Sequence, residues 1–307
     1  MPKSTPNSSR AFRSILCPID FSVPSATSLR YAAIIAKRLD ARLHAIYVND
    51  PMLVAAAAVA LNDRELVNVA LAELRAFVAA AVPAAAAAIS CSVETGDPAR
   101  LIAAAAQRLK CDLVVMGTHG LSGVDKLLIG STTERMLRRT TVPVLAVPPA
   151  AASAGDNPPR SWPGPAILAP VDLREESQRD VRDAEKIARA FDTGLVLVHV
   201  VPHGQTPPWY RADVSAESRI RVTKAQRDLD ALAKTVGRGV ATEARVLAGN
   251  TPDEIAALAA EKRIGLVVMH LRKGPGFFGS RAGSIAAHVL RHAVTPVLAL
   301  PGRAKGT

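Results

Sequence analysis

Short apolar runs alternate along this chain with longer segments in which apolar residues recur every three or four positions. In the first half, the run Ile15 to Ile19 leads to Asp20, and a helical segment then extends from a Ser22-Val23-Pro24 start to about Leu39. Short apolar runs bounded by turn residues are typical of buried strands, and the longer periodic segments are typical of helices. The same criteria predict strands at 43–48, 89–94, 113–116 and 143–147, and helices at about 62–82, 99–109 and 131–140. This alternation predicts an α/β fold with a five-stranded parallel sheet and helices on both faces.

The whole pattern then occurs a second time. Residues 167–172 repeat the first strand and its terminal acid, which becomes Asp172. At an offset of 153, residues 114–148 align without gaps to 267–301, and 13 of the 35 positions are identical. The sequence therefore predicts two tandem domains, residues 1–150 and 166–307, joined by a Pro-, Ala-, Gly- and Ser-rich linker at 151–165.

A glycine-rich stretch lies between the fourth predicted strand and the helix that follows it. Its spacing is Gly117-x2-Gly120-x9-Gly130-Ser131, and Ser131 and Glu134 are spaced as a capping box. Glycines allow backbone N–H groups to approach a phosphate closely, and the first turn of a helix adds further donors and a positive dipole end. Strand, glycine loop and helix start together predict an anion site; the alternative is a surface turn shaped by glycines.

Composition narrows the fold and the environment. The chain is 49% hydrophobic but only 4% aromatic, which favours an Ala-, Val-, Leu- and Ile-rich core under helices. The three cysteines have no metal-ligand spacing and are expected to be small buried side chains. No apolar signal segment and no run long enough for a bilayer is visible, so we expect a soluble cytoplasmic protein without a membrane partner.

The spacing of the glycines and the internal repeat resemble the universal stress protein family, in its two-domain form and its ATP-binding branch. That resemblance implies two tandem Rossmann-like, adenine-nucleotide-binding domains, and ATP as ligand with Mg²⁺ or Mn²⁺ as a candidate companion. It also implies an adenine–ribose pocket and a phosphate site. The alternative role of Asp20 is that of an anion at a helix N-terminus, and the alternative for His119 is an ordinary histidine of a surface loop. The implied pocket residues are Pro18, Ile19, Asp20 and Val48, and the implied phosphate residues are Gly117, Thr118, His119, Gly120, Gly130, Ser131, Thr132 and Thr133.

The second half departs from this pattern. Gly117 and Gly120 are replaced by His270 and Lys273, whereas Gly283 and Ser284 are retained together with Asp172. A literal G-x-G-x-x-G at 274–279 follows the fourth strand rather than the first, so it does not indicate a dinucleotide fingerprint. We expect this half to be empty or to hold a smaller or differently posed anion, attracted by Arg272, Lys273 and Arg281, and a purely structural role is the alternative.

The sequence leaves several functions open. No P-loop, nucleophile elbow or zinc cluster is present, which favours a regulatory or sensory ATP-binding module over a slow ATPase or an adenylyl-transferring enzyme. The net charge of +11 and pI near 10.1 suggest nucleic acid, but aromatic residues for stacking are scarce. The closing strands, 143–147 and 296–300, are expected to pair with each other as an intramolecular pseudo-dimer; a homodimer is left open.

Overall fold

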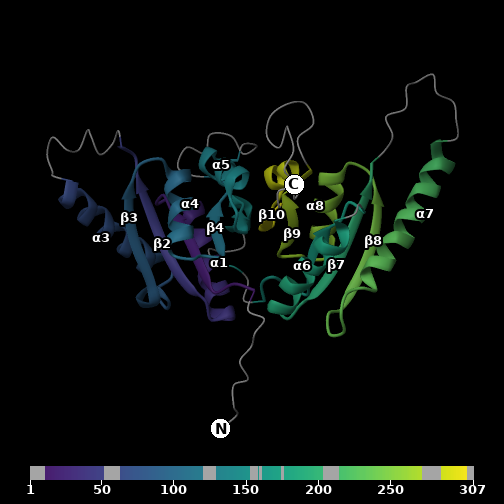
Figure 1. Cartoon of the computed structure of the whole chain (residues 1–307), viewed down its shortest axis with the longest axis horizontal. Helices are drawn as coiled ribbons and strands as arrows, with labels where there is room; N and C mark the ends of the chain where they lie inside the picture. The colour runs from purple at the N-terminus through teal and green to yellow at the C-terminus, as the bar shows by residue number, and fades with distance from the viewer. Residues whose placement is uncertain are drawn as a thin grey trace, which may run out of the picture. The chain divides into compact units, whose positions relative to one another are not determined.

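The computed structural model describes residues 11–51, 63–119, 129–152, 158, 161–173, 176–202, 214–271 and 285–302. The chain divides into two compact units, one made mainly of residues 1–159 and the other mainly of residues 160–298. Each unit is an alternation of strands and helices (Figure 1). The predicted α/β class and the two tandem Rossmann-like domains are confirmed.

The first unit carries five strands within the described residues, in the order β3-β2-β1-β4-β5. Neighbouring strands pair in parallel throughout this order. Helices α1 and α3 pack together on one face of the sheet, and α4 and α5 on the other. The elements are β1 Ser14–Ile19, α1 Val23–Leu39, β2 Arg42–Asn49, α3 Asp63–Ala81, β3 Ile89–Thr95, α4 Pro98–Arg108, β4 Leu113–Gly117, α5 Ser131–Arg139 and β5 Val144–Val147, with short 3-10 turns at Ala86–Ala88 and Pro149–Ala152.

The second unit repeats this order as β10-β9-β6-β7-β8. Strand β6 pairs in parallel with β7 and β9, and β7 with β8. Helices α6 and α7 pack together, and so do α8 and α9. The elements are β6 Ala166–Pro170, α6 Ser177–Ala190, β7 Gly194–Val201, α7 Val214–Ala233, β8 Thr242–Ala248, α8 Thr251–Glu261, β9 Val267–Leu271, α9 Ile285–His292 and β10 Val297–Pro301.

The start and end of α1 show how local chemistry fixes an element. Ser22 is the N-cap, its side chain accepts from the Ser25 amide, and Pro24 lies in the first turn, as predicted. The helix ends at Asp40, which adopts a left-handed conformation with φ 51°. The equivalent residue of the second unit, Asp192, has φ 44°, so the repeat preserves the same helix stop.

Part of the predicted linker is folded onto the second unit. Trp162 is 3% exposed, and its indole Nε1–H donates to the Gly265 carbonyl at 2.6 Å. Its ring meets Phe191 edge-on at 5.3 Å between centroids. Thr193 Oγ1 also donates to the Gly164 carbonyl at 2.8 Å. Residues 161–165 therefore belong to the packed structure, because an aromatic side chain anchors them.

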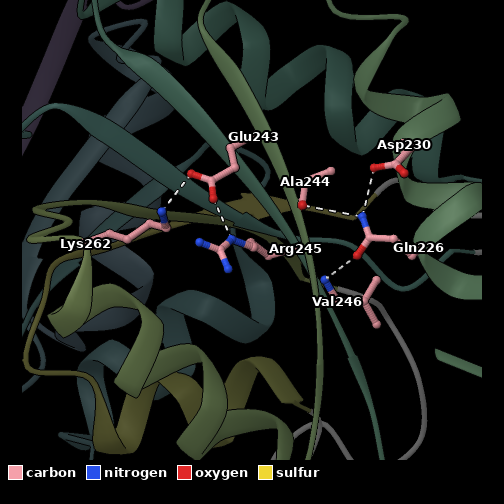
Figure 2. Close-up of polar contacts among 7 residues, drawn as sticks. All are labelled: Gln226, Asp230, Glu243, Ala244, Arg245, Val246 and Lys262. Carbon is pink, nitrogen blue, oxygen red and sulfur yellow. Dashed lines mark hydrogen bonds and ion pairs between the residues drawn. The ribbon is translucent and has the colours of Figure 1, made fainter. Parts of the chain in front are cut away.

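The outer edge of β8 is closed by a side chain from α7 (Figure 2). The Gln226 amide accepts from the Val246 N–H at 3.2 Å and donates to the Ala244 carbonyl at 3.5 Å and to Asp230 Oδ1 at 2.8 Å. Its carboxamide thus imitates the peptide group of a further strand. Unpaired edges invite strand addition, so this contact protects the edge of the sheet.

We expect Gln226→Ala to lower the free energy of unfolding by about 1 kcal/mol, because two backbone groups of β8 lose their protein partner. The measurement is a urea titration of the full chain. Arg227→Ala, an exposed neighbour on α7, is the matched control. Equal stability of the two variants would contradict a role for the amide.

Candidate functional site

The carboxyl ends of β1, β2 and β4 meet at one edge of the first sheet. The chain runs outward from β1 to β2 and β3 and then returns to β4 on the other side of β1, so the strand order reverses here. Ligands of open α/β sheets bind at such a switch point. A cavity of about 420 Å³ lies at this edge, a size within the usual range for small-molecule sites.

Most of the residues predicted for the site lie together in the wall of this cavity. Thr118 does not line it and is buried beside it, and Gly120 lies outside the described residues. The predicted residues that line the cavity are Pro18, Ile19, Asp20, Val48, Gly117, His119, Gly130, Ser131, Thr132 and Thr133.

Two hydrogen bonds join the end of β4 to the start of α5, and a third joins it to β5. The Gly130 amide donates to the Thr118 carbonyl at 2.7 Å, and Thr133 Oγ1 donates to the Gly117 carbonyl at 2.7 Å. The Thr118 amide donates in turn to the Val147 carbonyl of β5 at 3.0 Å. The two ends of the glycine loop are therefore fixed to each other and to the sheet.

The N-terminus of α5 has no side-chain cap. Its N-cap residue is Gly130, and Ser131 is already the first helical residue, so the predicted capping box of Ser131 and Glu134 is wrong. Glu134 instead pairs with Arg138 at 2.6 Å, one turn along the helix. Because glycine has no side chain to fold back, the first-turn amides keep their capacity to donate to an anion.

Asp20 lies at the end of β1 and lines the cavity. It also accepts from the Ser22 amide at 3.0 Å and from the Ser22 hydroxyl, both through Oδ1. Phe21 between them adopts φ 63°, and its counterpart Leu173 adopts φ 57°. The helix-anchoring role and a ligand-contact role are therefore compatible, because the hydrogen bonds of Asp20 within the described residues use a single oxygen.

His119 is the ionisable base of the cavity wall. Its Nδ1 lies 2.8 Å from Thr118 Oγ1, and its Nε2 is buried with no hydrogen-bond partner within the described part of the chain. Buried polar atoms in native proteins almost always have a partner, so such an atom calls for an explanation.

Further residues line the cavity that the sequence reasoning did not single out. Two of them, Tyr47 and Asp50, flank Val48 in the sequence. Burial raises the pKa of Tyr47, and the negative charges of Asp20 and Asp50 raise it further. Ser25 comes from the first turn of α1. Asp50 could have been found from its place at the end of the second strand. The other additional lining residues are Ile46, Pro98, Ile102 and Met116.

The same position of the second unit is built differently. His270 replaces Gly117 at the end of the fourth strand, and its Nδ1 and Nε2 lie 3.2 Å and 3.3 Å from carboxylate oxygens of Asp180 and Asp183 on α6. The repeat aligns these two acids with Ser28 and Tyr31 of α1. The imidazole is 12% exposed, and the two carboxylates are 13% and 25% exposed. A compact charged cluster therefore stands where the first unit has a glycine.

The hydroxyl groups that fix the glycine loop are also absent from the second unit. Thr118 aligns with Leu271 and Thr133 with Ala286, both buried. The alanine removes the hydroxyl that bonds to the Gly117 carbonyl in the first unit, and the leucine removes the hydroxyl that bonds to His119 there. The predicted Gly283, Ser284, Arg272, Lys273 and Arg281 lie outside the described residues, and Asp172 lies two residues beyond the end of β6.

Among the residues placed by the structure, no group of three or more His, Cys, Asp or Glu side chains could hold a metal ion. Within the same residues, no helix is long and apolar enough to cross a membrane.

Fold, duplication and cavity define a tandem Rossmann-like α/β protein with a switch-point site in its first unit. The model of the universal stress protein family matches residues 11–148 and 165–301, so the chain belongs to this family. It is 33% identical over 147 residues to universal stress protein MJ0531 of Methanocaldococcus jannaschii, covering 46% of this chain and 85% of that protein.

Two solved structures resemble the chain over nearly its whole length. The universal stress protein of Archaeoglobus fulgidus superposes with a TM-score of 0.60 at 20% identity, covering 94% of this chain and 98% of the other. PA1789 of Pseudomonas aeruginosa, a protein of unknown function, superposes with a TM-score of 0.62 at 20% identity, covering 96% and 94%. At this identity they support the tandem fold alone.

Proposed function

We propose that the first unit binds ATP and acts as a regulatory or sensory module rather than an enzyme. The observation that carries the proposal is the cavity at the switch point, with a carboxylate at the end of β1 and an uncapped helix N-terminus beside Gly130. A carboxylate accepts hydrogen bonds from ribose hydroxyls, and first-turn amides donate to phosphate oxygens. The two ends of the cavity thus fit the two ends of a nucleotide.

A divalent ion fits this site only as a companion of the nucleotide. Within the described part of the chain, no three-ligand cluster holds a metal without help. Magnesium commonly keeps several waters and is bound through substrate phosphates and one or two carboxylates. We therefore expect Mg²⁺ or Mn²⁺ to arrive on the phosphates, with Asp20 and Asp50 as the nearby acids of the cavity wall.

We infer that the second unit is not an equal ATP site. The His270 cluster, Leu271 and Ala286 replace the groups that form the anion end of the first site. One ATP per chain is the expected stoichiometry.

Calorimetry of the full chain with ATP, with adenosine and with added Mg²⁺ tests the proposal. One ATP site together with negligible phosphate release over hours would support a binding module. Absence of binding by both ligands would reject the nucleotide assignment, and steady hydrolysis with Mg²⁺ would favour the ATPase alternative. Mass spectrometry of the undialysed protein would identify a co-purifying ligand.

Without added divalent ion, Asp20→Asn should weaken ATP and adenosine binding to the same extent, about fivefold each, because the change then affects the nucleoside end alone. Asparagine keeps an oxygen that can accept from Ser22, which preserves the start of α1. Calorimetry with both ligands measures the two ratios. A loss confined to ATP would place the carboxylate at the wrong end of the ligand.

A further inference from the structure

The described side chains of the cavity wall supply few positive charges for a phosphorylated ligand. Among the described residues that line it, Asp20 and Asp50 are acids, and lysine and arginine are absent. Two arginines of the neighbouring helix α5 are engaged by acids: Arg135 pairs with Asp97 at 3.0 Å and Arg138 with Glu134 at 2.6 Å. Tyr47 cannot become a cation. Of the described lining residues, His119 alone can supply a positive charge.

The bond from Thr118 orients the imidazole of His119. Thr118 is 1% exposed, and its hydroxyl hydrogen has one acceptor within the described residues, His119 Nδ1 at 2.8 Å. When the hydroxyl donates to Nδ1, the neutral ring carries its proton on Nε2. When the ring is protonated, Nδ1–H donates to the threonine oxygen and Nε2–H remains a donor. In both states Nε2 presents a hydrogen.

This hydrogen has no acceptor in the described part of the protein, although Nε2 is buried. His119 lines the cavity, so an acceptor can come from a molecule bound there. The cavity also borders Ser131 and Thr132 at the start of α5, where hydroxyls and first-turn amides supply further donors. A buried donor beside these groups is suited to a phosphate oxygen.

We propose that His119 is the cationic contact of the site: its Nε2–H donates to a phosphate group of the bound ligand, and binding favours the protonated ring. The proposal rests on the proposed function and adds a regulation to it, because occupancy by a phosphorylated ligand becomes dependent on pH. Histidine is the side chain whose charge ordinarily changes between about pH 5 and 8. Thr118 acts as a positioning residue through Nδ1.

The test compares ATP and adenosine binding to the full chain at pH 6.5 and pH 8.5, by calorimetry. His119→Gln keeps a neutral donor but cannot become a cation. We expect it to weaken ATP binding about tenfold at pH 6.5 and much less at pH 8.5, with adenosine unchanged at both. Thr118→Val should weaken ATP binding in the same direction and flatten its pH profile.

His44→Gln is the matched control. His44 has the other buried, unpartnered imidazole nitrogen of the described first unit, and it does not line the cavity. Its variant should bind both ligands as the parent does. Equal ATP affinity of His119→Gln and the parent at both pH values, with adenosine still bound, would overturn the inference and leave the proposed function standing. If the parent protein bound neither ATP nor adenosine, both the proposed function and this inference would be overturned.

Discussion

Gly130→Val is expected to weaken ATP binding about a hundredfold and to leave adenosine binding near that of the parent. Gly130 is the N-cap of α5 and lines the cavity, so an added branched side chain occupies space beside the amides that we propose as phosphate contacts. Losing two hydrogen bonds to a charged acceptor, at about 1.5 kcal/mol or more each, accounts for this factor. Its φ of −54° accepts valine without backbone strain. Calorimetry with both ligands gives the two affinities.

Gly283→Val provides the matched change in the second half, because Gly283 is the repeat counterpart of Gly130. It should leave the single ATP site untouched. Gly117→Val is a less selective change, because a Cβ there would lie 3.0 Å from the His119 carbonyl oxygen and 3.2 Å from Pro24 Cβ, and the packing of β4 on α1 would shift. Equal ATP affinity of Gly130→Val and the parent would exclude this helix start as the phosphate site.

The order of elements could be predicted because each one has a local signal. Ser22 with Pro24 marks the start of α1, and the run Leu113 to Met116 marks β4; both were found within a residue of their observed bounds. The repeat doubled this information, since each half supports the interpretation of the other. Parallel pairing followed from the alternation of strand and helix.

The details of the site depended on three-dimensional contacts that spacing does not encode. The capping-box spacing at Ser131 was misleading, because Gly130 takes the N-cap position and Glu134 turns to Arg138. The His270 cluster was missed because its acids are 90 and 87 positions away in the chain, on α6. The replacement of Gly117 by His270 was visible in the sequence, but the contact of His270 with Asp180 and Asp183 was not.

Other predictions stay predictions. Pairing of the closing strands 143–147 and 296–300, homodimer formation and a cytoplasmic location are not tested by the structure or the comparisons. ATP contact by the individual site residues is likewise a proposal, which the variants above address.

Asp183→Asn should reduce the protection of β9 amides from hydrogen exchange about thirtyfold at neutral pH, equivalent to about 2 kcal/mol. The hydrogen bond from His270 is the main cause that holds the pKa of the Asp183 carboxyl well below its usual range, and Lys186 at 2.8 Å adds to it against the opposing effect of burial. Asparagine keeps the shape and loses the charge, so His270 and Lys186 lose a charged partner. Exchange measured residue by residue reports on this unit alone.

The pH dependence follows from the direction of that pKa shift. A carboxyl whose pKa is lowered by folding contributes its full stability above its unfolded pKa, about 3.9, and loses it as the pH falls further. The difference in protection between the parent and Asp183→Asn should therefore shrink below about pH 4. Asp228→Asn, an exposed carboxylate on α7, should show no such difference. A difference between Asp183→Asn and the parent that persisted unchanged to pH 3 would mean that the shape of the side chain, and not its charge, holds α6 to the end of β9.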